Sequence, residues 1–312
     1  METEETVPFP RRCTACRRLY ARVRTTFGSW NQAVFPAAGR RSLDEDAAAP
    51  AVPDDVVALA GAYPAGSRGP CKTAAIPVDV VRAIAASLGV TTRRQEAAGG
   101  MGRVFALSDP DRVLKISDAT TSWSAFEPRA YAVLRERDVP CVRLVGSVSH
   151  PPYVAMVLDR AEVTLTAIVR AAARVRPDSA RSLARAVRPL LAGLRAAGLV
   201  FGDLSPDNVM LAGADLVLID PQFLVDAAAF RRRMGEARAH AFDTVYLALK
   251  IQAIGFVDVR AAAFARELAG AVLGREAPAD DTAARWLLRE APVGLFLAYD
   301  INLGAPGNKM PT

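Results

Sequence analysis

The stretch that decides the fold lies at residues 200–224 and reads VFGDLSPDNVMLAGADLVLIDPQFL. Asp203, Asn208 and Asp220 stand in it among apolar residues that are typical of buried strands. An ionised carboxylate is costly to bury unless a positive charge compensates it, so these groups either face water or gather around a cation. A turn at Gly213 would join two strands and bring Asn208 and Asp220 to one sheet edge, beside Asp203. Amide and carboxylate oxygens without histidine or thiol suit Mg²⁺, so the stretch predicts a metal-phosphate site.

The composition is that of a globular chain with a sizeable core. Of the 312 residues, 51% are hydrophobic, which is enough for two domains or lobes. No apolar run reaches the ~18 residues of a membrane span. The start METEETVPFPRR also lacks the basic-then-apolar layout of a signal peptide. We therefore expect a soluble intracellular protein of the cytoplasm or nucleus, without membrane binding.

The basic excess and the cysteines both lie partly near the start of the chain. The net charge is +6, and arginines gather in residues 11–24, which begin with Arg11 and end with Arg24. We expect a solvated basic face there, with nuclear targeting or an acidic partner as the alternative, and no direct binding of nucleic acid. Cys13 and Cys16 form the only close pair among four cysteines, so we expect free thiols, with half of a zinc site as the alternative.

Residues 1–92 read as an N-terminal extension that is partly flexible. Proline, glycine, alanine and charge dominate its middle, and these residues favour mobile connections. Short helices are predicted at 53–62 and 77–88, where proline opens a run with apolar residues at helical spacing. In the second helix we expect one face to hold Val78, Val81, Ile84 and Leu88.

Residues 93–158 change to short strand-like runs. The runs RVFALS at 103–108 and RVLKIS at 112–117 predict a hairpin, and two further strands are predicted within 141–159. A helix is predicted at 128–137 between these pairs. This part reads as a small antiparallel-sheet lobe, which we term the N-lobe.

Residues 159–312 read as a larger helical lobe, the C-lobe. Helical periodicity is clear at 179–197, the stretch 200–224 follows, and helical segments continue to about residue 290. Strands first and helices second predict an α+β chain of two lobes. A cleft between lobes is a common place for a ligand.

Three further features carry chemistry. Gly99, Gly100 and Gly102 precede a predicted strand, where residues without a β-carbon let backbone amides approach a phosphate; a plain turn is the alternative. Lys115 alternates with apolar residues on the next strand and either faces solvent or grips a phosphate. Glu127 opens the following predicted helix and is the nearest acid that could hold Lys115.

In this order, the glycine run, the strand lysine, the helix acid, D-L-x-x-x-N at 203–208 and the later Asp220 resemble the protein-kinase signature set. The resemblance covers about 93–253 and implies a two-lobed protein-kinase-like fold that uses ATP and Mg²⁺. It implies that Lys115 grips the α- and β-phosphates while paired with Glu127, and that Asp203 accepts the proton of the substrate hydroxyl. The implied metal ligands are Asn208 and Asp220.

The same resemblance implies where the nucleotide would lie. The loop with Gly99, Gly100 and Gly102 would cover the phosphates, and Val104 would lie below the adenine. The segment from Asp159 to Ala161 would be the hinge beside the adenine. Asp243 resembles the aspartate that opens the helix beneath the catalytic loop and braces the loop backbone.

The sequence also departs from the kinase pattern. Ala97 replaces the first glycine, Phe201-Gly202 replaces the usual histidine-arginine, Ser205 replaces a lysine, and Pro221-Gln222 follows Asp220. Asp220 and Asp243 are also too close in sequence for an ordinary activation segment, so control by loop phosphorylation is not expected. Herpesvirus protein kinases are similar in the hydroxyl residue and proline after the catalytic aspartate, and RIO-type atypical kinases are similar in Gly-Asp-Leu-Ser.

The resemblance implies an atypical, viral-type serine/threonine protein kinase, which would act in a host cell. Small-molecule phosphotransferases of the aminoglycoside and choline type share the lobe plan and Gly-Asp-Leu, and they form the first alternative. A pseudokinase that binds nucleotide and serves as a scaffold forms the second. The altered Ser205 and Pro221-Gln222 favour the scaffold, whereas Lys115, Glu127, Asp203, Asn208 and Asp220 favour an enzyme.

Overall fold

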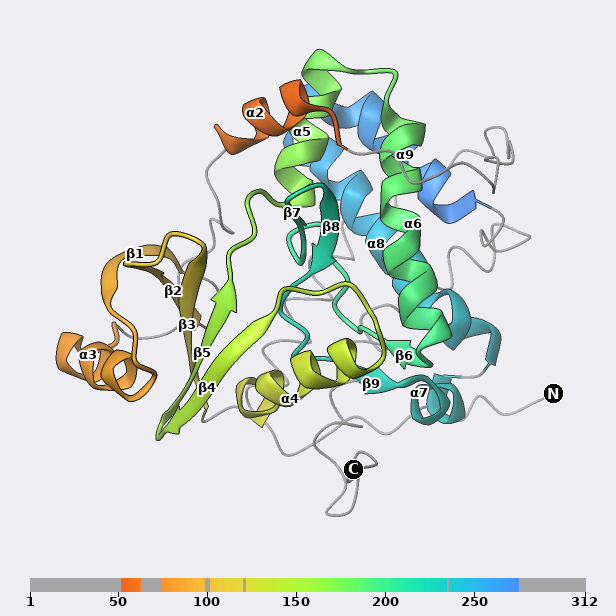
Figure 1. Ribbon diagram of the computed structural model, residues 1–312. Coiled ribbons are helices and arrows are strands. Elements are labelled where there is room, and N and C mark those ends of the chain that lie inside the picture. Colours follow the sequence, from red (N-terminus) through yellow and green to blue (C-terminus); the bar gives the residue numbers. More distant parts are fainter. Residues whose placement is uncertain (1–51, 63–74, 99–101, 120–121, 235, 275–312) are drawn as a thin grey trace.

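The computed structural model describes residues 52–62, 75–98, 102–119, 122–234 and 236–274. In these ranges the protein is α+β: a small antiparallel sheet lies to one side of a larger group of helices (Figure 1). The class expected from the sequence is thus confirmed. Cys13, Cys16, the arginine-rich residues 11–24, Gly99 and Gly100 lie outside the described residues, as does the predicted helix beyond 274. No helix within the described ranges is long and apolar enough to cross a membrane.

The sheet has five strands in the order β1-β2-β3-β5-β4, and all neighbours are antiparallel. The predicted hairpin is confirmed as β2 with β3, and the two further predicted strands are present as β4 and β5, which pair with each other. Lys115 lies at the centre of the sheet, opposite Val104 on one side and Met156 on the other. The strands are β1 (Thr92–Ala98), β2 (Gly102–Leu107), β3 (Arg112–Asp118), β4 (Leu144–His150) and β5 (Tyr153–Asp159).

Helices α3 (Val78–Ser87) and α4 (Ser122–Glu136) pack on opposite faces of this sheet. Successive strand residues point to opposite faces, so Ile116 packs with the α3 side and its neighbour Lys115 points to the α4 side. Met156 likewise belongs to the cluster around Tyr131 of α4. The alternation of β3 therefore aims Lys115 at α4.

Two expectations about these helices are wrong in detail. Val78 is 65% exposed, so the buried face of α3 holds Val81 and Ile84 but not its first residue. The helix predicted at 128–137 begins at Ser122, so Glu127 lies inside α4 instead of opening it. Pro128 is accommodated within the helix at the loss of one backbone N–H donor.

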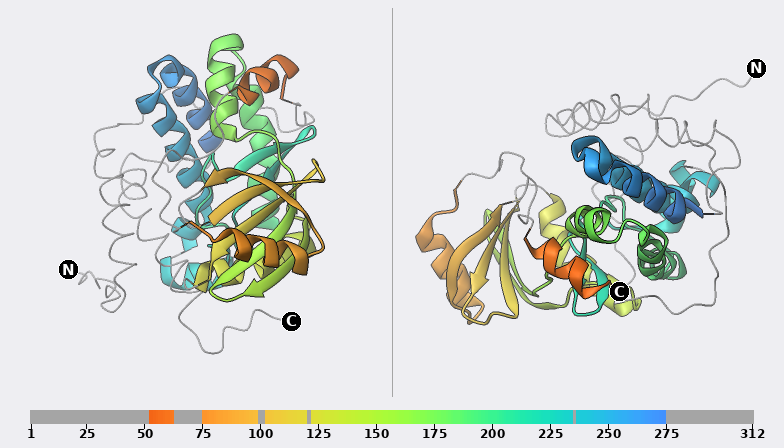
Figure 2. Two further views of the ribbon diagram at one scale, coloured as in Figure 1. Left: turned by 90° about the vertical axis from the view of Figure 1, so that its left-hand side faces the viewer. Right: turned by 90° about the horizontal axis from the view of Figure 1, so that it is seen from above.

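The helical part surrounds α8 (Glu236–Val257), whose residues 245–249 are all buried. A helix that is apolar on every side belongs in a core. The view from above shows the helices of this part gathered to one side of the sheet (Figure 2). They are α2 (Asp54–Gly61), α5 (Leu165–Val175), α6 (Ala180–Ala196), α7 (Ala227–Met234) and α9 (Ala262–Leu273), with a short 3₁₀ turn at Val259–Ala261.

The predicted helices at 53–62 and 77–88 pack on different parts of the molecule. Val56 and Ala60 of α2 belong to the core of the helical part, and α2 lies beside α5 (Figure 1). Ile84 of α3 belongs instead to the sheet core. An exposed ion pair of 2.8 Å between Asp55 and Arg176 adds to the contact of α2.

Two short antiparallel strand pairs follow α6 in the chain. β7 (Val209–Ala212) pairs with β8 (Asp215–Leu218) around Gly213, whose φ of +62° suits a residue without a β-carbon. β6 (Leu199–Val200) pairs with β9 (Val225–Asp226). Residues 199–226 thus form one strand pair nested between the two strands of the other, and Asp203, Asn208 and Asp220 lie in the connections.

Candidate functional site

Lys115 lies between two carboxylates that come from distant parts of the chain. Its Nζ donates to Oε1 of Glu127 on α4 at 2.7 Å and also contacts Oδ1 of Asp220, which follows β8. The Glu127 side chain is fully buried, and that of Lys115 is 11% exposed. The pairing of Lys115 with Glu127 predicted from the sequence is therefore present. We call Lys115, Glu127 and Asp220 the sheet-side cluster.

Charge pairing sets the protonation of the sheet-side cluster. Burial raises the pKa of Glu127 to about 7, although the Lys115 ammonium opposes this. Burial also acts to raise the pKa of Asp220, but Lys115 more than offsets it, so the pKa is lowered. Burial acts to lower the pKa of Lys115, and the two carboxylates reverse the shift, so it is raised. Lys115 and Asp220 are therefore charged at neutral pH.

The backbone at Asp220 is turned sharply to make this contact. Its φ is +58°, in the left-handed region that aspartate tolerates better than most residues. Its N–H donates to the hydroxyl of Tyr131 at 3.0 Å. Tyr131 lies one helical turn after Glu127 on α4, so one helix face holds both the partner of Lys115 and the support of Asp220.

The β7–β8 hairpin brings Asn208 and Asp220 to one end, as predicted. Val209 pairs with Leu218, and the N–H of Ile219 donates to the carbonyl of Asn208 at 3.0 Å. Nδ2 of Asn208 donates to the carbonyl of Asp203 at 2.8 Å. This bond fixes the amide orientation and leaves the side-chain oxygen as the atom that could bind a cation.

Asp243 of α8 supports the loop that carries Asp203. Its two oxygens accept hydrogen bonds from the N–H groups of Phe201 at 2.7 Å and Gly202 at 3.1 Å. Gly202 has a φ of +83°, so a residue with a side chain would be strained there. Burial raises the pKa of Asp243 to about 6, against these two hydrogen bonds. The bracing expected of Asp243 is present, but the residue lies within α8 and does not open it.

Tyr246 and Lys250 reach the same loop from α8. The Tyr246 hydroxyl donates to Oδ1 of Asp203 at 2.7 Å, and Nζ of Lys250 lies 5.3 Å from the centre of the Tyr246 ring. Burial raises the pKa of Asp203, whereas Lys250 and the hydrogen bond from Tyr246 lower it. We call Asp203, Asn208, Asp243, Tyr246 and Lys250 the loop-side cluster.

Sequence reasoning missed Tyr131, Tyr246 and Lys250. In AFDTVYLALK, the positions 243, 246 and 250 follow helical spacing, so these three polar groups share one face of an otherwise apolar helix. Glu127 and Tyr131 have the same relation in EPRAY. This spacing of polar residues is visible in the sequence, but it indicates a site only once the loop that they contact is known.

The described residues that were expected to bind the rest of a nucleotide lie on β2 (Gly102 and Val104) and at or just after the end of β5 (Asp159 and Ala161). Gly102 is buried at the start of β2, where a β-carbon would come within 2.7 Å of the Ser117 hydroxyl oxygen. Val104 is half-buried opposite Lys115. Asp159 ends β5 and pairs with Arg143 at 2.8 Å. The half-buried Ala161 packs against the cluster that contains Tyr131.

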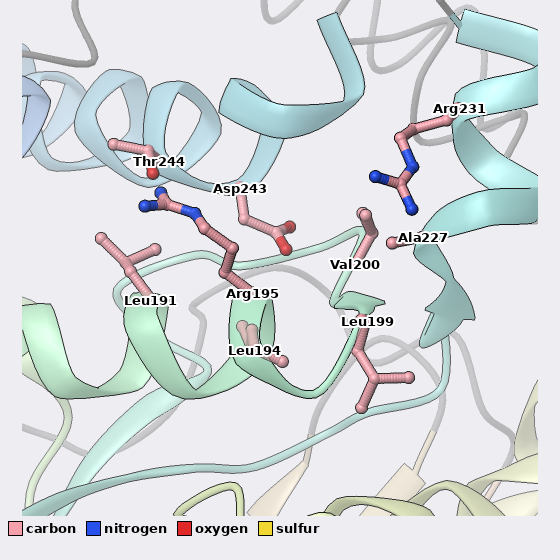
Figure 3. A pocket seen from close by; sticks show the side chains of 10 residues that line it. Leu191, Leu194, Arg195, Leu199, Val200, Ala227, Arg231, Asp243 and Thr244 are labelled. Atoms are coloured by element: carbon pink, nitrogen blue, oxygen red, sulfur yellow. The ribbon is translucent and has the colours of Figure 1, made fainter. Parts of the chain in front are cut away.

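A cavity of about 90 Å³ lies behind the loop, between α6, α7 and α8 (Figure 3). Arg195, Arg231 and Asp243 line it together with apolar residues of α6 and β6. Figure 3 shows Asp243 beside Val200, the residue that precedes the loop. Lys115, Asp203, Asn208 and Asp220 do not line this cavity, so of the two clusters only Asp243 borders it.

The oxygens of Asn208 and Asp220 form a donor set that fits a hard divalent cation such as Mg²⁺. Across the described ranges, no group of three histidine, cysteine, aspartate or glutamate residues could hold a metal by itself. A cation here would therefore need further oxygens from a ligand, as Mg²⁺ takes from nucleotide phosphates. A scan of protein-family models gave no match to the chain. A search of curated proteins gave no match either.

Proposed function

We propose that the protein is an atypical protein-kinase-like enzyme that transfers a phosphoryl group from Mg-ATP to serine or threonine hydroxyls of proteins. The observation that carries the proposal is the meeting of Lys115, Glu127 and Asp220 at one point. Asp203 and Asn208 lie in the loop that leads into the same hairpin. These five residues follow in the order of the kinase signature set, and their contacts support the roles of that set.

Lys115 and Glu127 would bind the nucleotide. A buried ammonium is a strong partner for phosphate oxygens, and Glu127 holds it in place from a rigid helix. In the described state Asp220 also contacts Lys115. Phosphate oxygens would share Lys115 with Glu127, which would free Asp220 for the metal.

Asn208 and Asp220 would hold Mg²⁺, which supplies neutralisation of phosphate charge when it is bound. Asp203 would accept the proton of the acceptor hydroxyl as that oxygen forms its bond to phosphorus. The bond between the phosphorus and the oxygen of ADP breaks at the same time. Tyr246 and Asn208 keep Asp203 oriented for this step, through one hydrogen bond to its carboxylate and one to its carbonyl.

A turnover assay of the full chain tests the proposal. The purified protein is incubated with γ-labelled Mg-ATP, generic protein acceptors, an aminoglycoside and choline. We expect label in protein, and loss of it by at least about a hundredfold in D203A, with binding of Mg-ATP retained in a thermal-shift titration. D215N removes an exposed carboxylate of the same hairpin and serves as the matched control.

Other outcomes assign other functions. Label in the small amine and not in protein would replace the proposal with a small-molecule phosphotransferase. Binding of Mg-ATP without transfer would indicate a nucleotide-binding scaffold, the candidate that the Lys115–Asp220 contact and Ser205 favour. An unchanged rate in D203A would contradict the role of Asp203.

A further inference from the structure

The acceptor side of the site gathers negative charge. Asp203 and Asp207 lie in one short loop, and Asp220 lies at the end of the hairpin that follows it. The loop itself, FGDLSPDN at 201–208, contains no lysine or arginine. Lys115 is held by Glu127 and Asp220. A phosphoryl group that approached Asp203 would thus meet carboxylates unless another cation lay close.

Lys250 is that cation. It follows Tyr246 by four residues on α8, so both side chains lie on one helix face. Its Nζ lies over the Tyr246 ring at 5.3 Å from the ring centre, and the hydroxyl of that ring is bonded to Asp203.

Lys250 also stands out within its own helix. Residues 245–249 and Ile251 are buried, and Lys250 is half-buried among them. A charged side chain in such surroundings is costly unless a partner or an aromatic face offsets the cost. The Tyr246 ring offers such a face, since an ammonium is attracted to aromatic π-electrons. The ammonium therefore lies over the ring whose hydroxyl donates to Asp203.

We propose that Lys250 is a positioning residue of the transfer reaction, which replaces from α8 the loop cation that is absent at Ser205. Its ammonium offsets the negative charge of Asp203 as the transferred phosphoryl group arrives. The inference rests on the proposed function. In the step, the acceptor oxygen forms the new P–O bond, the P–O bond to ADP breaks, and the proton passes to Asp203. Lys250 takes no proton and leaves the ATP-binding cluster unchanged.

The test compares K250M, which removes the charge, with K250R, which keeps it. The matched control is R266M, because Arg266 is an exposed cation on α9 outside the site. For K250M we expect kcat to fall about 10- to 100-fold while the KM for ATP stays within about twofold. K250R should recover most of kcat, and R266M should equal the wild type.

A binding measurement gives a second readout. Calorimetry with Mg-ADP, alone and with aluminium fluoride as a mimic of the transferred phosphoryl group, separates ground-state from transition-state binding. K250M should weaken only the fluoride complex. Equal loss in K250M and K250R, or equal weakening of both complexes, would overturn the charge role of Lys250.

The two proposals fail in different ways. Transfer by the wild type with an unchanged kcat in K250M overturns the role of Lys250 and leaves the proposed function intact. Absence of transfer and of Mg-ADP binding in the wild type overturns the proposed function, and the role of Lys250 with it.

Discussion

The sheet-side and loop-side clusters hold their carboxylates by different means. In the sheet-side cluster Lys115 lies against Glu127 and Asp220, so opposite charges compensate one another directly. In the loop-side cluster Asp203 and Asp243 accept hydrogen bonds from a tyrosine hydroxyl and from backbone N–H groups, and the positive charge of Lys250 acts to lower the pKa of Asp203. The first cluster therefore depends on the pairing of opposite charges, and the second on hydrogen bonds between one loop and helix α8.

The largest effect is expected from a substitution that breaks the sheet-side cluster. K115M leaves Glu127 buried without its cation, so Glu127 takes up a proton and the free energy of unfolding falls by about 3–4 kcal/mol. Transfer activity should be lost at the same time. K115M/E127L should recover much of the stability but no activity, because a buried pair is replaced by apolar groups. Urea denaturation measures the stabilities.

An exposed ion pair supplies the control for this experiment. Arg143 and Asp159 are also 2.8 Å apart, but the Arg143 side chain is 59% exposed. R143M should change the free energy of unfolding by less than about 1 kcal/mol. A loss in R143M equal to that in K115M would show that burial does not distinguish the two pairs.

The next largest effect is expected from a substitution that breaks the loop-side cluster, and its size depends on pH. D243A leaves the N–H groups of Phe201 and Gly202 without their acceptor, at a cost of about 3 kcal/mol near pH 4.5. The pKa of Asp243 is raised from its usual 3.8 to about 6, so the folded chain keeps this proton to a higher pH than the unfolded chain.

The sign of the pH effect follows from that shift. Between about pH 4 and 6 the unfolded chain releases the proton first, so the contribution of Asp243 to stability falls by about 3 kcal/mol as pH rises. The loss in D243A should therefore be larger at pH 4.5 than at pH 7. Urea denaturation of wild type and D243A at both values tests this, and a loss that grows with pH would contradict it.

The smallest effect is expected from Y246F, which tests one hydrogen bond of the loop-side cluster. Y246F removes the hydrogen bond to Asp203 and keeps the ring beneath Lys250, at a stability cost of about 1 kcal/mol. We expect kcat to fall about tenfold with little change in the KM for ATP, because Asp203 loses one orienting contact. Steady-state kinetics measures both. An unchanged kcat would show that Asn208 and the loop orient Asp203 without Tyr246.

Sequence patterns predicted the sheet-side cluster better than the loop-side one. Lys115 on a strand and Glu127 nearby are local signals, and the Gly213 turn was enough to place Asn208 and Asp220 together. The start of α4 was missed because Pro128 reads as a helix opening, although this helix contains it. Tyr246 and Lys250 escaped notice because they stand among apolar residues in α8, so their shared face with Asp243 did not look like a solvent-facing side.

Helix α5 and the packing of α2 and α3 also could not be read from the sequence. α5 begins after Thr164, whose hydroxyl accepts from the N–H of Ala167 at 3.2 Å, a cap that is weak evidence without its packing partners. α2 and α3 are close in sequence, yet one joins the helical core and the other the sheet core. Tertiary burial, and not local propensity, decides where each one packs.

The placement of α2 and α3 gives the molecule a second covalent tie between its two parts. The first tie is the segment from Asp159 to Leu165, between β5 and α5. The second runs from the anchored Val56 to the anchored Ile84. Two connections restrict the relative rotation of the two parts more than a single connection would. Any rotation of one part against the other therefore has to be compatible with both connections.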